Sequence, residues 1–340
     1  MKIINRVHTC IFIIFSLIIS SCEKDGSHEN YPDGVNFNIS YRLLEGRKII
    51  CMDIDMEGNL CAGSDNQLIL IDKQKGQKII KLDYEIRDVA IAQDGSIWAG
   101  TNGGGLAHID GNGITYYDTS NSGLPRDYVS EVEIAPDGKV WFTSCAFNIG
   151  GLGIYDGRKF EFLTPENSPL NQNLIFALDI NSDGIVYLAT SGTVGRTNIY
   201  RITGRKWECL GDEGGTFYSV FSFDASPSGL LYLIEDFSLS SAFHTTNNLY
   251  KLQDDKWKLI DSGNISRIGF FARVALDKRN YSWIADHKDG SIILNVYNGR
   301  SWQSSMPRTF PDDFITTLKV DHENNIWLGT YQNGIIVLNQ

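Results

Sequence analysis

Apolar and polar residues alternate with the two-residue period of β-strands along most of the chain. The alternating runs come in pairs, and a Gly or Asn in the short connection permits the left-handed backbone of a tight turn. In one pair, Asp137-Gly138 stands between the apolar residues Val132 and Ile134 and the run Val140–Thr143. The pattern therefore predicts repeated β-hairpins.

The second run of each hairpin has one large side chain at an equivalent place, which we call the aromatic position. It is occupied in turn by Cys61, Trp98, Trp141, Tyr187, Tyr232, Trp283 and Trp327. Third and fourth strand-like runs follow several hairpins, as in Gly153–Asp156 and Lys159–Leu163. A repeat of about 40–50 residues with four strands is typical of propeller blades. We therefore expect an all-β fold, a seven-bladed β-propeller of four-stranded blades, over residues 35–340.

The last repeat has three strand-like runs, so its outer edge needs a partner. Residues 36–44 alternate Phe37, Ile39, Tyr41 and Leu43 with polar residues and precede the first hairpin. Because an open strand edge is a liability, we expect this segment to be the fourth strand of blade seven and to close the ring.

The N-terminus predicts export from the cell. Lys2 and Arg6 precede the apolar run Cys10–Ile19, which is too short to span a membrane and reads as a signal peptide over residues 1–21. Ile19-Ser20-Ser21-Cys22 resembles the lipobox of bacterial lipoproteins, which implies lipidation of Cys22. An ordinary signal peptide with an incidental cysteine is the alternative. Residues 22–34 read as a flexible tether.

The acidic residues after Cys22 resemble an export signal of Gram-negative glycan degraders. We therefore expect an outer membrane lipoprotein of a Gram-negative bacterium, exposed at the cell surface or facing the periplasm. The lipid would be its only membrane anchor.

Two segments carry a family resemblance. Gly123-Leu124-Pro125-Arg126-Asp127 runs into the hairpin of Trp141, and Pro311-Asp312-Asp313-Phe314-Ile315 runs into that of Trp327. Both resemble the two-component regulator propeller repeat. Such propellers usually form periplasmic parts of sensor kinases that detect glycan fragments, which implies a propeller fold and a glycan-related context. The sequence has one set of repeats and no kinase, so the resemblance does not imply signalling by this chain alone.

Charge and cysteines narrow the picture further. The formal net charge of −11 argues against a nucleic-acid partner. We expect a monomer whose partner is an oligosaccharide or another envelope protein. Cys51 and Cys61 lie on neighbouring predicted strands but diagonally, so two buried thiols are expected there and a disulfide is the alternative.

Catalytic motifs are missing from the sequence. No histidine pair has metal-ligand spacing, and no nucleophile elbow or phosphate loop occurs. Asp53–Gly58 and Asp179–Gly184 resemble calcium loops, yet hairpin turns need the same residues. We therefore expect no catalytic residue, metal or cofactor. A lyase or hydrolase is the alternative, because streptogramin lyases share the fold and use a histidine near the channel, a part that His244 or His287 could take.

Long connections predict the ligand site. Ser144–Gly151, Ser191–Asn198 and Glu235–Asn248 exceed the length that the repeat needs, and they belong to consecutive blades. Together with interblade connections they should form an aromatic and polar wall suited to sugar rings. The candidate ligand-binding residues are Tyr128, Phe147, Asn148, Arg196, Tyr218, Glu235, Asp236, Phe237, Phe243, His244, Phe271, His287 and Phe314.

Overall fold

The computed structural model describes most of the chain after its N-terminal segment. The described residues are 34–146, 149–190, 197–210, 220–226, 231–235, 248–261, 272–288, 290–306 and 308–340. The chain divides into two units, Met1–Val35 and Asn36–Gln340, and every strand lies in the second. In the described residues all regular structure is β, and none forms a helix that could cross a membrane.

The strands are short, because each hairpin turn recurs after a few residues. The first half holds β1 (Tyr41–Leu43), β2 (Cys51–Ile54), β3 (Leu60–Ser64), β4 (Gln67–Ile71), β5 (Gln77–Lys81), β6 (Glu85–Ile91), β7 (Ile97–Asn102), β8 (Leu106–Asp110), β9 (Gly113–Tyr117), β10 (Val132–Ile134), β11 (Val140–Ala146), β12 (Ile149–Tyr155), β13 (Phe160–Leu163) and β14 (Ile175–Ile180). The second half holds β15 (Val186–Thr190), β16 (Ile199–Thr203), β17 (Lys206–Cys209), β18 (Val220–Ala225), β19 (Leu231–Glu235), β20 (Asn248–Gln253), β21 (Lys256–Ile260), β22 (Arg273–Leu276), β23 (Ser282–Lys288), β24 (Ser291–Tyr297), β25 (Trp302–Ser304), β26 (Ile315–Val320), β27 (Ile326–Thr330) and β28 (Ile335–Leu338).

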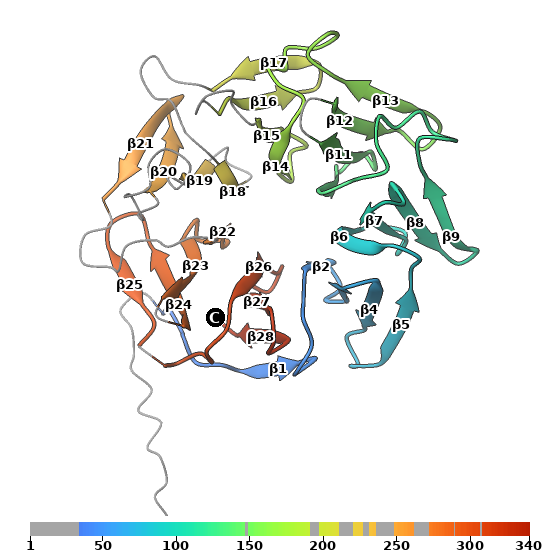
Figure 1. Ribbon diagram of the computed structural model, residues 1–340. Helices are drawn as coiled ribbons and strands as arrows, with labels where there is room; N and C mark the ends of the chain where they lie inside the picture. The colour runs from blue at the N-terminus through green and yellow to red at the C-terminus, as the bar shows by residue number, and fades with distance from the viewer. Residues whose placement is uncertain are drawn as a thin grey trace, which may run out of the picture. The chain divides into compact units, whose positions relative to one another are not determined.

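Hydrogen-bond pairing groups the described strands into seven antiparallel sheets of four strands each. Six sheets follow the chain, namely β2–β5, β6–β9, β10–β13, β14–β17, β18–β21 and β22–β25. The remaining sheet has the order β1-β28-β27-β26 and so joins the two ends of this unit. Figure 1 shows the sheets arranged around a centre, with β2, β6, β14, β18, β22 and β26 nearest to it. We call the sheets blades one to seven, beginning with β2–β5.

The predicted closing strand is wrong in its extent. Residues 36–44 were expected to pair throughout, but β1 covers only Tyr41–Leu43, which pair with Ile335–Val337. Before β1 the side chains replace the backbone ladder: the Asn36 amide donates to the Asn339 carbonyl at 2.9 Å, and the Asn38 N–H donates to Asn36 Oδ1. Side chains that bond the local backbone compete with strand pairing, which explains the shortening.

The aromatic positions lie in the core between blades. Trp283, Tyr187 and Tyr232 are among the largest fully buried side chains, and Cys61 is also fully buried. Each is on the second strand of its sheet, and Cys61, Tyr187 and Tyr232 pack in core clusters with residues of the next blade. The repeat predicted from the sequence is therefore a repeat of interblade packing.

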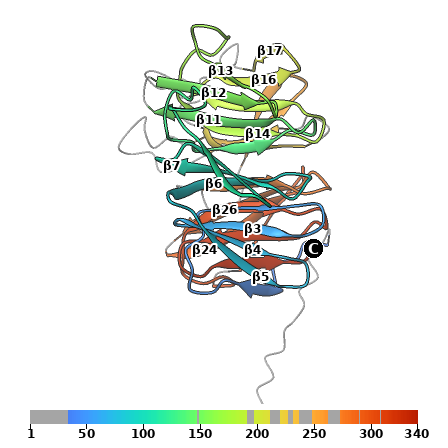
Figure 2. The same ribbon diagram turned by 90° about the vertical axis from the view of Figure 1, so that its right-hand side faces the viewer.

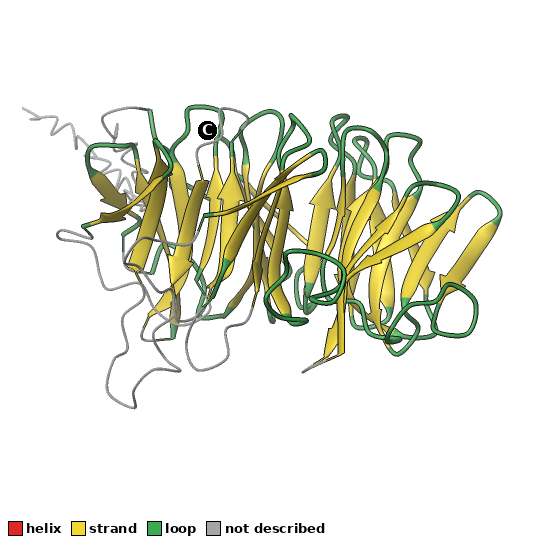
Figure 3. Cartoon of the chain, turned by 90° about the horizontal axis from the view of Figure 1, so that it is seen from above, coloured by secondary structure: helices red, strands yellow, loops and turns green. Residues whose placement is uncertain are grey.

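Two ends of the ring can be told apart by their connections. The loop face has the connections between second and third strands and those between successive blades. The hairpin face has the turns that join first to second and third to fourth strands. Figure 2 shows strands that run between the two ends, and Figure 3 shows loops gathered at both of them.

The predicted long connections are described only in part. Ser144–Gly151 was expected to be a loop, but β11 and β12 continue their pairing to Ala146 and Ile149, so most of it is an extended hairpin. Residues 191–196 and 236–247 of the other two connections lie outside the described residues. Cys51 pairs with Gly63 and Asp53 with Cys61, which makes the two cysteines diagonal, and both are free thiols.

Candidate functional site

A cavity of about 660 Å³ occupies the centre of the ring and is lined mainly by the innermost strands. Two inward-facing positions of each innermost strand supply much of the lining. One is the residue that pairs with the aromatic position, and the other lies two residues earlier. The polar and charged side chains of these two positions are Asp53, Asp88, Glu131, Glu133, Asp179, Ser222, Asp224, Arg273, Thr317 and Lys319.

Four of these carboxylates join each blade to the next one. Innermost strands of adjacent blades share no backbone ladder, so some of their N–H groups need another acceptor. The carboxylates supply it. The pairs are Ile91 N–H to Asp53 (2.7 Å), Val132 N–H to Asp88 (2.9 Å), Ala225 N–H to Asp179 (2.8 Å) and Leu276 N–H to Asp224 (2.5 Å).

An ion pair crosses the channel between distant blades. The Lys319 ammonium of β26 lies 3.8 Å from the Glu133 carboxylate of β10. Burial raises the pKa of Glu133 and Lys319 opposes that shift, while Glu133 in turn raises the pKa of Lys319. Both side chains are still partly exposed in the channel, Lys319 over 39% and Glu133 over 25% of the side-chain surface. Lys319 thus balances part of the acidic lining.

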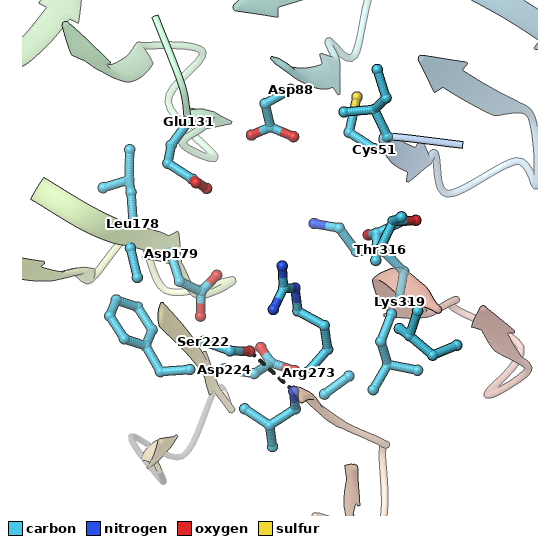
Figure 4. A pocket seen from close by; sticks show the side chains of 18 of the residues that line it. Cys51, Asp88, Glu131, Leu178, Asp179, Ser222, Asp224, Arg273, Thr316 and Lys319 are labelled. Carbon is cyan, nitrogen blue, oxygen red and sulfur yellow. Dashed lines mark hydrogen bonds between the residues drawn. The ribbon is translucent and has the colours of Figure 1, made fainter. Parts of the chain in front are cut away.

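Glu131 and Arg273 face the same channel from blades three and six (Figure 4). Burial, reinforced by the charge of Asp88, raises the pKa of Glu131 to about 8 although Arg273 opposes the shift. Burial lowers the pKa of Arg273, and Glu131 opposes that change. Each group therefore makes the charge of the other less costly in the channel.

Two aspartates on neighbouring strands interact directly. Asp179 of β14 and Asp224 of β18 are hydrogen bonded through their side chains. Burial and the charge of Asp224 raise the pKa of Asp179 to about 7, and burial raises the pKa of Asp224. Two carboxyl groups this close favour sharing one proton.

This channel lining was missed in reading the sequence, although a signal for it is present. Each innermost strand has a residue between its two apolar core residues, and in four strands that residue is Asp or Glu, in another Lys. A strand with one buried face and one solvent-exposed face gives no reason for acidic and basic residues to occur at a single position of the repeat. The position between the two apolar core residues therefore identifies side chains that face the channel.

Three of the predicted ligand-binding residues lie on the loop face and have side chains that the structure describes, namely Tyr128, His287 and Phe314. His287 and Phe314 stack across blades six and seven, with ring centroids 4.2 Å apart. Tyr128 lies under the Arg87 guanidinium, 5.9 Å from its ring centroid, and lines a hollow of about 490 Å³ that also includes Ile149. The structure thus places His287 and Phe314 together and Tyr128 elsewhere on the same face.

Two further aromatic residues on the loop face were not predicted. Tyr331 is 47% exposed and lies under the Lys48 ammonium, at 5.4 Å, on the rim of the channel. Tyr84 is 38% exposed and covers Gly104, where an added Cβ would meet the tyrosine ring at 2.2 Å. Tyr84 is in the connection between blades one and two, and Tyr331 follows β27. Both connections belong to the loop face, so the positions of these residues in the repeat could have identified them from the sequence.

The other candidate residues are described only through their backbone or lie outside the described residues. Glu235 ends β19, where its backbone pairs with Val220 and Asn248. The lipidation candidate Cys22 and nine ligand candidates lie outside the described residues, namely Phe147, Asn148, Arg196, Tyr218, Asp236, Phe237, Phe243, His244 and Phe271.

The described residues offer little for catalysis. They contain no cluster of His, Cys, Asp and Glu that could hold a metal ion, and no histidine is among the residues lining the channel. In the first calcium-like segment Asp55 accepts the N–H groups of Glu57 and Asn59, which is a turn cap. Asp53 and Asp179 of the two segments instead accept N–H groups of the next blade.

Comparisons with known proteins agree on the propeller. Residues 309–332 match the family described as two component regulator propeller, which confirms the resemblance seen in the sequence. No curated protein matches the chain.

Several solved structures are similar. Virginiamycin B lyase from Staphylococcus aureus has a TM-score of 0.68 at 13% identity, over 88% of this chain and 98% of the lyase. The extracellular domain of a hybrid two component system from B. thetaiotaomicron has a TM-score of 0.64 at 17% identity, over 87% of this chain but only 39% of that one. The structure of YCF48 bound to D1 peptide has a TM-score of 0.62 at 15% identity, over 87% of this chain and 94% of YCF48. Identities this low show the fold alone.

Proposed function

We propose that this chain is a non-catalytic binding propeller that recognises an oligosaccharide on its loop face. The observation that carries the proposal is the set of accessible aromatic rings around the channel rim. Phe314 is 48% exposed beside His287, and Tyr331 is 47% exposed beside Lys48. Soluble proteins bury most large aromatic side chains, so several exposed ones on one face favour a binding role.

The chemistry of this rim suits sugars. Exposed aromatic rings stack on the CH faces of a sugar, and nearby polar groups bond its hydroxyls. On the loop face those polar groups include Lys48, Arg87 and Glu85. The resemblance to propellers of glycan sensors supports the same ligand class, and an envelope protein is the other partner that the sequence suggests.

A lyase or hydrolase receives less support from the same face. His287 packs its ring on Phe314, and it is not among the residues that line the channel. A base needs to reach its substrate proton within hydrogen-bond distance. Non-catalytic binding is therefore the function that the described geometry favours.

Calorimetry with a panel of oligosaccharides tests this function. Phe314→Ala and Tyr331→Ala should each weaken binding by about 1–3 kcal/mol, the usual cost of removing a central aromatic contact. Leu259→Ala is the matched control, because Leu259 is 57% exposed on the outer strand β21 and should leave affinity unchanged. Unchanged affinity in the Phe314→Ala, Tyr331→Ala double variant would exclude this rim as the site.

We also propose that the protein is held at the outer envelope by a lipid on Cys22. The short apolar run before Ile19-Ser20-Ser21-Cys22 supports this placement. Cys22→Ala should move the protein from the membrane fraction to the soluble fraction of expressing cells, whereas Cys209→Ala should not. Membrane association of the Cys22→Ala protein, with no acyl mass on the wild-type protein, would contradict the lipid anchor.

A further inference from the structure

One turn position on the hairpin face differs between blades. Where the turn after an innermost strand is described, its first residue closes that turn through its backbone, as in Asp277 and Asp321. The residues at this place are Asp55, Ala92, Ala135, Asn181, Ser226, Asp277 and Asp321. Blades two and three are therefore unusual in having alanine where the others have a polar side chain.

The polar residue has a second task where the aromatic position is tryptophan. Asp277 accepts the indole N–H of Trp283 at 3.1 Å, and Asp321 accepts that of Trp327 at 2.8 Å. Trp98 and Trp141 face Ala92 and Ala135 instead, and no described residue accepts a hydrogen bond from either indole. The N–H of Trp98 is also not among the fully buried polar atoms that lack a partner, so it is accessible.

A hollow of about 380 Å³ lies at the place of the missing side chains, between blades two and three. Its lining includes Ala92, Trp98, Tyr117, Ala135, Val140 and Tyr155. His108 stacks on the Trp98 ring at a centroid distance of 4.2 Å, so the indole offers a ligand its N–H rather than its ring face. The hollow combines the Trp98 N–H with the methyl groups of Ala92 and Ala135 and with two half-buried tyrosine rings.

The carboxylate of Asp94 disfavours an acidic ligand in the hollow, whose lining also includes His108. Asp94 lines it and accepts the N–H and hydroxyl of Ser96 at 2.9 and 2.7 Å. These bonds lower the pKa of Asp94, which is therefore negative at neutral pH. A ligand carboxylate in place of the missing aspartate would be repelled, whereas a neutral carbonyl oxygen would not.

We propose that this hollow binds the acetamido group of an N-acetylated sugar. The acetamido carbonyl accepts the Trp98 N–H in the role that Asp277 and Asp321 have in blades six and seven. Its methyl group packs against Ala92 and Ala135, and the sugar ring lies against Tyr155. The site is on the hairpin face, so it does not depend on the loop-face function proposed above.

The test follows the indole N–H resonance of Trp98, assigned with Trp98→Phe, during titration with N-acetylglucosamine. The resonance should shift with N-acetylglucosamine and stay in place with glucose and glucosamine, which lack the carbonyl. Ala92→Asp should restore the bond seen in blades six and seven, keep or raise the melting temperature, and weaken binding at least tenfold. Asn181→Asp, at the same turn position in blade four, is the matched control and should bind as the wild-type protein does.

Three results would overturn the proposal. One is the absence of any Trp98 shift with N-acetylglucosamine, and another is an equal shift with glucose. The third is wild-type affinity in a folded Ala92→Asp protein. If that variant does not fold, Trp98→Phe decides by calorimetry: loss of the indole donor should weaken binding roughly tenfold, and unchanged affinity would contradict the site.

Discussion

Charged residues in the channel serve the fold before they serve any ligand. Asp53, Asp88, Asp179 and Asp224 each accept an N–H group from the next blade, which satisfies donors that the sheets leave unpaired. These bonds join separate sheets where no ladder does. Glu131 accepts no such bond among the described residues, so burial is the main cause of its raised pKa.

The raised pKa of Glu131 predicts a fall in stability with rising pH. A carboxyl group that is harder to ionise in the folded protein binds its proton more tightly there than in the unfolded chain. Its stabilising effect is complete below the ordinary pKa of 4.5 and is lost as the pH rises through about 8. Asp179, whose pKa is about 7, acts in the same direction. The melting temperature should therefore be lower at pH 8 than at pH 5.

Glu131→Gln tests this at the level of one residue. The variant removes the ionisable group and keeps its shape, so the difference in melting temperature between pH 5 and pH 8 should shrink. Glu57→Gln changes an exposed residue on the hairpin face and should retain the wild-type difference. A full wild-type difference in Glu131→Gln would show that Glu131 does not cause the pH dependence.

Residue roles could be read from the sequence where they repeat within a strand pair. The aromatic positions and the turn residues recur with fixed spacing, so their burial and capping follow from local pattern. The cross-channel pair of Lys319 and Glu133 does not recur, because it joins blades that are distant in sequence. Only the ring geometry brings these two side chains together.

At the scale of elements, closure depends on a very short strand. β1 contributes three residues, the Asn36 side chain donates to the Asn339 carbonyl, and the Gln340 side chain donates to the Asn36 carbonyl. Tyr41 also packs against Trp327 with ring centroids 6.1 Å apart. Strand pairing, amide bonds and an aromatic contact therefore act together on blade seven.

Deletion of residues 36–43 should lower the free energy of unfolding by several kcal/mol, since burial and hydrogen bonds are lost together. Chemical denaturation measures this. Asn38→Ala is the control, because Asn38 lies in the same segment but outside β1, and it should cost under about 1 kcal/mol. Equal unfolding free energies for the deletion and the wild-type protein would show that β1 does not stabilise the ring.

Strand positions were more predictable than connections for a physical reason. Period-two alternation reports directly on burial, so β13 (Phe160–Leu163) lies within the predicted run Lys159–Leu163. In Ser144–Gly151 the strands continue through Cys145 and Gly150, whose pairing is set by hydrogen bonds and not by alternation. The alternation pattern therefore predicts a hairpin that is shorter than the one in the structure.

For the whole molecule, the ring separates two kinds of surface. The loop face carries the exposed rings of Phe314, Tyr331 and Tyr84, of which Tyr331 lines the charged channel, and the hairpin face carries repeated capped turns. The sequence located part of the first surface, through Phe314 and His287. It could not locate Tyr331, because this ring meets Lys48 on the channel rim only after the chain closes on itself.

The central claim is that ligand binding takes place on the loop face. Hydrogen–deuterium exchange of the protein with an oligosaccharide that was found by calorimetry and has no N-acetyl group tests it most directly. The account predicts slower exchange at the loop-face ends of the innermost strands, around Glu85, Ser130 and Ile315, and in the turn after β27. Slowing confined to the opposite turns, Ala92–Ser96 and Ala135–Lys139, would contradict it.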